Sequence, residues 1–138
     1  MPHQIVEVSP NIEKMLDMEG LVQALHQCAA KQEALALGGI RTRVYTASHT
    51  MIADESGDFG FIAVYLRIAE GRSMEVRKQM GQELMDCLCD YVDEQLGNAP
   101  LALSYEIQEI EADMRWNRNK VPESVSYTHL TLPTILLV

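Results

Sequence analysis

Pro2 is the first residue of the chain whose type could do chemistry. An initiator methionine is usually removed before a small second residue, which would leave this proline with a free secondary amine. Unlike an internal backbone nitrogen, that amine is basic, and burial and neighbouring cations both lower its pKa. An amine whose pKa lies near neutrality is a general base of suitable strength at working pH. The alternative is that Pro2 affects only N-terminal processing.

Two arginines stand where expected elements begin and could bind an anion. Arg72 lies in the sequence Glu-Gly-Arg-Ser, directly before Ser73, which can cap a helix. The first backbone amides of a helix point toward an anion placed there, and arginine binds a carboxylate in a bidentate manner. Arg41 follows Gly-Gly-Ile at the start of an expected strand and is the counterpart of Arg72 in the first half of the chain. The alternative is that both arginines are solvated and bind nothing.

The elements that must position these residues occur in a doubled β-α-β order. Alternating or continuous apolar runs predict strands, and apolar residues three and four apart predict helices. The expected elements are strand 3–8, helix 18–32, strand 40–45, strand 59–68, helix 74–96 and strand 101–110. Each crossover is long enough to join two parallel strands. We therefore expect an α+β fold, with a four-stranded sheet and two helices on one of its faces.

The segment from Phe59 to Ile68 is nearly continuous in apolar residues, which is typical of a strand that is covered on both faces. The two expected helices can cover only one face of the sheet. Nothing else in the chain is available for the second face, so we expect self-association to cover it.

The composition limits the class of protein. The chain has 138 residues, which is one domain's worth, and its net charge is −9 from 20 acidic and 11 basic residues. Nucleic acids and anionic membrane surfaces are recognised by clustered Lys and Arg, so we expect neither partner. The chain contains no apolar run of about 20 residues and begins without a signal-peptide pattern. We therefore expect a cytoplasmic protein.

The sequence predicts no metal and no organic cofactor. The three cysteines, Cys28, Cys87 and Cys89, are too few and too irregularly spaced for a zinc site or a disulfide framework. The histidines show no metal-ligand spacing, and no glycine-rich phosphate loop precedes a helix. We expect the cysteines to be reduced and mostly buried.

The last stretch, residues 124–138, differs in character from the rest of the chain. It carries no charged side chain, and residues 125–134 can be written as the codons GTC TCT TAT ACA CAT CTG ACG CTG CCG ACG. That string resembles a transposon-based sequencing adapter translated in frame. We therefore expect residues 1–123 to form the domain and residues 124–138 to be foreign, with the authentic C-terminus missing; the alternative is a natural hydrophobic strand.

Four motifs in register carry a resemblance to a known family. They are Met-Pro-His-x-Ile-Val-Glu at 1–7, Leu-Gly-Gly-Ile-Arg-x-Arg-x-Tyr at 37–45, Gly-Arg-Ser at 71–73 and Leu-x-Leu-Ser-x-Glu-Ile at 101–107. With the terminal Asn-x-Asn-x-Val at 117–121, the chain resembles the 5-carboxymethyl-2-hydroxymuconate Δ-isomerase family of the tautomerase superfamily over residues 1–121. Gln4 and Val8 depart from the more apolar or aromatic residues that this resemblance leads us to expect.

The resemblance implies a trimer and a chemistry. By motif match, Pro2 is the base, and Arg41 and Arg72 bind substrate carboxylates and stabilise charge. We assign charge stabilisation to Arg41, because Arg72 precedes a helix N-terminus that suits a permanent carboxylate. The implied substrate is a small unsaturated 2-hydroxy or 2-oxo acid with two or three carboxylates, namely 5-carboxymethyl-2-hydroxymuconate in 4-hydroxyphenylacetate (homoprotocatechuate) catabolism. The alternatives are another proline-based tautomerase, dehalogenase or decarboxylase, and a noncatalytic trimeric module that binds anions.

Overall fold

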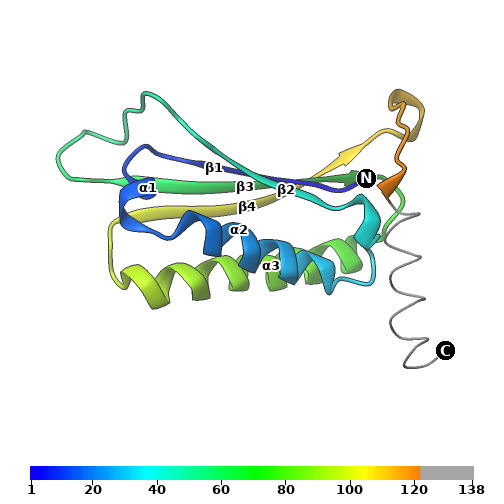
Figure 1. The fold of residues 1–138 in the computed structure, drawn as a ribbon, viewed down its shortest axis with the longest axis horizontal. Helices are drawn as coiled ribbons and strands as arrows, with labels where there is room; N and C mark the ends of the chain where they lie inside the picture. The colour runs from blue at the N-terminus through cyan, green and yellow to red at the C-terminus, as the bar shows by residue number, and fades with distance from the viewer. Residues whose placement is uncertain (122–138) are drawn as a thin grey trace.

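The computed structural model describes residues 1–121 (Figure 1). Residues 124–138, which we expect to be foreign, lie outside these described residues.

The four strands form one mixed sheet in the order β2-β1-β3-β4. The central strands β1 and β3 are antiparallel, while β1 pairs with β2 and β3 pairs with β4 in parallel. The α+β fold with two β-α-β units is therefore confirmed, and each strand lies within one residue of its expected position. The strand bounds are β1 His3–Val8, β2 Arg41–Thr46, β3 Gly60–Ala69 and β4 Leu101–Ile110.

The helices α2, Met18–Ala30, and α3, Met74–Leu96, lie side by side on one face of the sheet (Figure 1). Helix α3 has the bounds expected from its apolar spacing, and α2 ends two residues before its expected end. The sequence did not predict the one-turn helix α1, Ile12–Met15, or the 3₁₀ turns η1, Leu37–Gly39, and η2, Ala112–Met114. Elements of one turn are too short to show a periodic pattern.

The core lies between the sheet and the helices. Strand β3 contributes side chains at every second position, and α3 contributes one at every fourth, which is the spacing that keeps them on one face. Complete burial of one such side chain contributes about 1.5–3 kcal/mol. The main fully or nearly fully buried side chains from these two elements are Ile62, Val64, Leu66, Ile68, Met80, Leu84, Leu88 and Val92.

The opposite face of the sheet has no helix over it within the described residues (Figure 1). On this open face, Phe61, Ala63 and Tyr65 of β3 are only half-buried. Their register places Ile5 of β1 beside Tyr65, so the apolar surface continues across the two central strands. Apolar side chains therefore occupy both faces of β3, as the sequence predicts.

Candidate active site

Pro2 lies at one end of the sheet, where β1 and β2 begin. The residue is buried, and its carbonyl oxygen accepts a hydrogen bond of 3.0 Å from the backbone N–H of Arg41. The turn η1 lies against Pro2, because a Cβ atom added at Gly39 would be only 3.2 Å from Pro2 Cδ. Glycine at position 39 therefore allows this close approach. The parallel pairing of β1 with β2 brings Pro2 and Arg41 together from distant parts of the sequence.

Three arginines influence the amine at the N-terminus. Burial lowers the pKa of the Met1 amine, and the positive charges of Arg115, Arg72 and Arg41 lower it further. These arginines come from the segment after η2, the loop between β3 and α3, and the first residue of β2. Removal of Met1 would place a new amine one residue further in, at the buried Pro2. The structure therefore gathers Pro2, Arg41 and Arg72, the three residues singled out in the sequence, at one end of the sheet.

The guanidinium of Arg41 is held from two sides. Its Nη1 donates to the carbonyl oxygen of Gly39 at 2.8 Å, and its Nη2 donates to Oδ1 of Asn119 at 3.2 Å. The first bond ties Arg41 to the turn that lies against Pro2. The second ties it to the segment that follows β4. This arginine is therefore fixed in direction rather than solvated.

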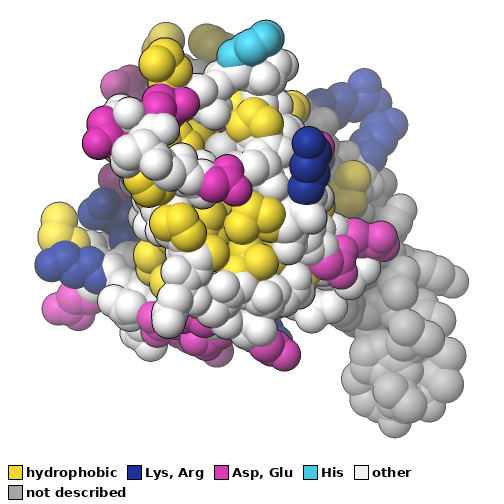
Figure 2. Space-filling model, turned by 90° about the vertical axis from the view of Figure 1, so that its left-hand side faces the viewer, with side chains coloured by type: hydrophobic (Ala, Val, Ile, Leu, Met, Phe, Trp, Pro, Cys, Tyr) yellow, Lys and Arg dark blue, Asp and Glu magenta, His cyan; other side chains and the backbone are white. Residues whose placement is uncertain are grey.

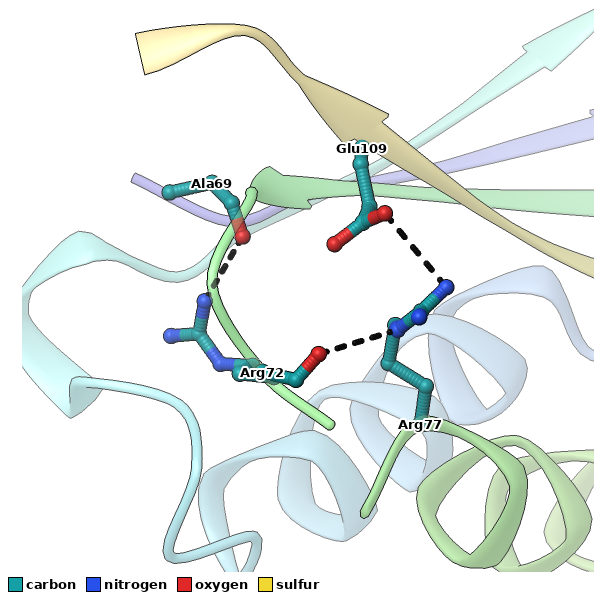
Figure 3. A network of polar contacts seen from close by, with 4 residues as sticks. All are labelled: Ala69, Arg72, Arg77 and Glu109. Carbon is teal, nitrogen blue, oxygen red and sulfur yellow. Dashed lines mark hydrogen bonds and ion pairs between the residues drawn. The ribbon is translucent and has the colours of Figure 1, made fainter. Parts of the chain in front are cut away.

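Arg72 is engaged chiefly by backbone carbonyls. Its Nε and Nη2 donate to the carbonyl oxygen of Ala34 at 2.8 and 2.5 Å, and its Nη1 donates to that of Ala69 at 2.9 Å. Arg77 donates in turn to the carbonyl oxygen of Arg72 and forms an ion pair of 3.4 Å with Glu109 (Figure 3). Arg72 therefore joins the end of β3 to the loop before η1 and has a structural role besides its charge.

The expected cap of helix α3 is present. The hydroxyl oxygen of Ser73 accepts a hydrogen bond of 3.2 Å from the backbone N–H of Val76. This bond satisfies one of the backbone donors that a helix N-terminus leaves free. Ser73 thereby sets the start of α3 directly after Arg72.

Further cations lie on the open face of the sheet beside this site. The register places His3 of β1 between Arg41 of β2 and Arg67 of β3, and Nη1 of Arg43 lies 3.3 Å from His3 Nδ1. Burial lowers the pKa of His3, and the charges of these arginines and of the N-terminus lower it further. A neutral His3 can accept from Arg43 through Nδ1. Within residues 1–121, the one ion pair joins Arg77 to Glu109, so no carboxylate of that part pairs with this cluster.

Sequence reasoning missed Arg115 and Asn119. Both lie after the last strand, in a segment without periodic apolar residues, and their position depends on how the chain returns across the sheet end. The Asn-x-Asn-x-Val motif marks the segment but does not predict what Asn119 contacts.

Gln4 belongs to the other side of the sheet. Its side chain is fully buried, and its Nε2 donates to the carbonyl oxygen of Leu25 at 3.2 Å and to Thr42 Oγ1 at 3.0 Å. Tyr105 donates from its hydroxyl to Gln4 Oε1 at 2.7 Å, and burial raises the pKa of this tyrosine. Gln4 therefore satisfies polar groups beneath the sheet, although it lies only two residues after Pro2.

An apolar groove at the other end of the molecule is a poor candidate for an anion site. Hydrophobic side chains gather on that end (Figure 2). A groove of about 370 Å³ there has no charged residue in its lining, which consists of Ile52, Ala53, Phe59, Gly60, Ala99, Pro100, Leu101 and Ala102.

Across residues 1–121, no group of three or more His, Cys, Asp or Glu side chains could hold a metal ion. In the same part of the chain, no helix is long and apolar enough to span a membrane.

Comparison with known proteins gives the family. Residues 2–125 match the family model of 5-carboxymethyl-2-hydroxymuconate isomerase. The chain is 34% identical over 121 residues to the 5-carboxymethyl-2-hydroxymuconate Delta-isomerase of Escherichia coli, which covers 88% of this chain and 96% of that protein. It superposes on the crystal structure of a 5-carboxymethyl-2-hydroxymuconate isomerase from Deinococcus radiodurans R1 with a TM-score of 0.81 and 31% identity, covering 90% and 93% of the two chains.

A more distant structure shares only the fold. The macrophage migration inhibitory factor-like protein of Entamoeba histolytica is 11% identical, with a TM-score of 0.57 and coverage of 86% and 96% of the two chains. The family model and the two relatives above 30% identity carry the assignment. The chain is an isomerase, and it belongs to the 5-carboxymethyl-2-hydroxymuconate isomerase family.

Proposed function

We propose that the chain isomerises 5-carboxymethyl-2-hydroxymuconate, or a closely related unsaturated 2-hydroxy or 2-oxo acid, with the amine of Pro2 as the general base. The observation that carries the proposal is the cluster of Arg41, Arg72 and Arg115 around the N-terminal amine. In a chain of net charge −9, this local positive charge is suited to a small anionic substrate. The family membership supports the substrate class.

The same cluster supports a basic role for the amine. Neighbouring positive charges disfavour the protonated amine, and so does burial. Both effects favour the free amine, which is the form that a general base needs, once Met1 has been removed. It takes a proton from the 2-hydroxyl group of the dienol, and the bonding electrons form the 2-oxo group as the double bonds shift. The protonated amine then returns the proton to a carbon further along the chain, so that the product is an isomer of the substrate.

The arginines have complementary roles in this mechanism. The proton transfer leaves negative charge spread over the dienolate, and a fixed cation near that charge lowers the barrier. Arg41 suits this role because Gly39 and Asn119 fix its guanidinium. Arg72 is placed before α3 and suits a carboxylate that is charged throughout the reaction. The chemistry needs neither a metal ion nor an organic cofactor.

We also propose a metabolic pathway and a cellular compartment for the reaction. Its substrate arises in the breakdown of 4-hydroxyphenylacetate through homoprotocatechuate, and we propose that the protein acts there, in the cytoplasm. The resemblance of its motifs to the family supports this placement.

The direct test is an assay of the purified chain with Met1 removed, with the state of the N-terminus checked by mass spectrometry. Ultraviolet absorbance should follow the conversion of 5-carboxymethyl-2-hydroxymuconate to its isomer, since the change in conjugation alters the spectrum. 2-Hydroxymuconate, which lacks the carboxymethyl group, and a halogenated acrylate test the other tautomerase and dehalogenase chemistries. Binding of these acids without turnover of any of them would favour the noncatalytic module instead.

We also propose that the protein is a homotrimer. The half-buried Phe61, Ala63 and Tyr65 on the open face support self-association, and the family resemblance supports the number three. Sedimentation equilibrium should report three subunits, and a Tyr65→Glu variant should shift the population toward monomers because it buries a charge in the proposed interface. A wild-type chain that stays monomeric at micromolar concentration would contradict this proposal.

A further inference from the structure

The segment after β4 returns to the N-terminal end of the sheet. Residues after Ile110 form the turn η2 and then run beside the start of β1, as the N label and the end of the coloured trace show (Figure 1). Within this segment the side chains of Arg115 and Asn119 are half-buried, whereas Arg118 and Lys120 next to Asn119 are exposed. Asn119 therefore points inward from a largely solvated segment.

The amide of Asn119 uses both its acceptor and its donor. Oδ1 accepts from Arg41 Nη2 at 3.2 Å and from the backbone N–H of Val121 at 2.9 Å. Nδ2 donates to the carbonyl oxygen of Gly38 at 3.1 Å. One side chain thus contacts both the guanidinium of Arg41 and the turn that precedes β2.

These contacts complete a ring of hydrogen bonds beside the proposed base. Arg41 Nη1 donates to Gly39, and Gly39 lies against Pro2. The ring therefore runs from Gly38 through the Asn119 amide to Arg41 and back to Gly39. Arginine has a long side chain with several rotatable bonds, so contacts at both terminal nitrogens are needed to fix its direction. Loss of Asn119 would leave only the contact to Gly39.

We propose that Asn119 is a positioning residue that fixes the Arg41 guanidinium beside Pro2. This inference rests on the proposed function, because it assigns Asn119 a role in placing the cation that meets the dienolate charge. A small displacement of a charged group away from the reacting atoms lowers the rate, even where the protein remains folded. Asn119 acts through Arg41 and makes no contact with the substrate in this mechanism.

A double-mutant cycle tests the inference. We expect Asn119→Ala to lower the same kinetic parameter as Arg41→Ala, by roughly tenfold, the size expected for a lost hydrogen bond to a charged group. The double variant should then be no slower than Arg41→Ala alone, because the contact is already absent. Asn117→Ala is the matched control, since Asn117 is an exposed asparagine of the same segment. It should retain wild-type kinetics.

Two outcomes would overturn the inference. One is a double variant whose fold loss of rate equals the product of the losses in Asn119→Ala and Arg41→Ala. Such a result indicates that Asn119 has a role independent of Arg41. The other is an unchanged rate in Asn119→Ala while Arg41→Ala is slow.

A readout without substrate separates this inference from the proposed function. Nuclear magnetic resonance of the Arg41 guanidinium should show faster proton exchange with water in Asn119→Ala than in wild type or Asn117→Ala. Equal exchange in all three proteins would overturn the positioning role whether or not the wild type turns over the substrate. Faster exchange in Asn119→Ala, found together with a wild type that lacks isomerase activity, would support the contact and reject the proposed function.

Discussion

A chain that keeps Met1 is expected to lose nearly all of its isomerase activity. Retained methionine acylates the Pro2 nitrogen, and an amide nitrogen is not basic. A general base contributes about 10²–10⁴-fold to rate, so a loss of that size is expected. Insertion of a glutamate between Met1 and Pro2 would achieve this, because methionine is kept before a large second residue. The measurement is kcat/KM, after mass spectrometry has confirmed which residue is N-terminal.

Circular dichroism and sedimentation of the inserted variant are the controls for folding and assembly. If this variant turned over substrate as fast as the processed chain, Pro2 would not be the base.

The pH dependence of kcat/KM is a second, independent test of the Pro2 amine. A base works only when deprotonated, so kcat/KM should rise with pH through the pKa of the amine and then level off.

The arginines around the amine should set the position of that rise. Burial and the charges of Arg115, Arg72 and Arg41 lower the pKa of the Met1 amine. We expect the same groups to lower the pKa of the Pro2 amine in the processed chain, so that the plateau is reached at a lower pH than for an amine in water. Arg115 contributes most among the three charges. Arg115→Ala should therefore raise this pKa and move the ascending limb toward higher pH. An unchanged limb would assign the titration to another group.

The second large effect is expected from Arg41→Ala, which should lower kcat by about 10²–10³-fold, as the loss of a group that stabilises transition-state charge does. Arg72→Ala should instead mainly raise KM, because a carboxylate held equally in both states contributes binding alone. It should also lower the melting temperature, since its removal leaves the carbonyl oxygens of Ala34 and Ala69 without their shared donor.

Steady-state kinetics and thermal melts at one protein concentration check both arginine variants. Arg118→Ala is the control for loss of a positive charge, since Arg118 is exposed in the C-terminal segment. A fall in kcat with Arg72→Ala and a rise in KM with Arg41→Ala would reverse the two assignments.

Much of the fold could be predicted from local pattern. The apolar spacing within residues 74–96 predicted α3, and Ser73 predicted its start. The buried face of this helix carries Met80, Leu84 and Leu88, which are four residues apart. The strands were predicted because their side chains alternate or are apolar on both faces. The antiparallel pairing of β1 with β3 was not predicted, because it depends on how two β-α-β units meet.

The site was predictable only as a set of residue types. Pro2, Arg41 and Arg72 were singled out, but the bonds that hold them join positions far apart in the chain. Arg72 donates to Ala34, 38 residues away, and Arg41 to Asn119, 78 residues away. No periodic pattern reports contacts at such separations. Their geometry follows from the complete fold rather than from any one segment.

The central position of β1 sets an order of events during synthesis. Strand β1 pairs with both β2 and β3, so its hydrogen bonds are complete only after Arg67 has left the ribosome. That requires roughly 60 further residues after β1, or about 3–12 seconds at 5–20 residues per second. During this interval the N-terminus is accessible to an aminopeptidase. The removal of Met1, which the proposed chemistry requires, can therefore take place then. In the folded sheet Met1 is half-buried, which makes it less accessible to an aminopeptidase. We therefore expect Met1 to be removed, and the catalytic amine to be exposed, before folding is complete.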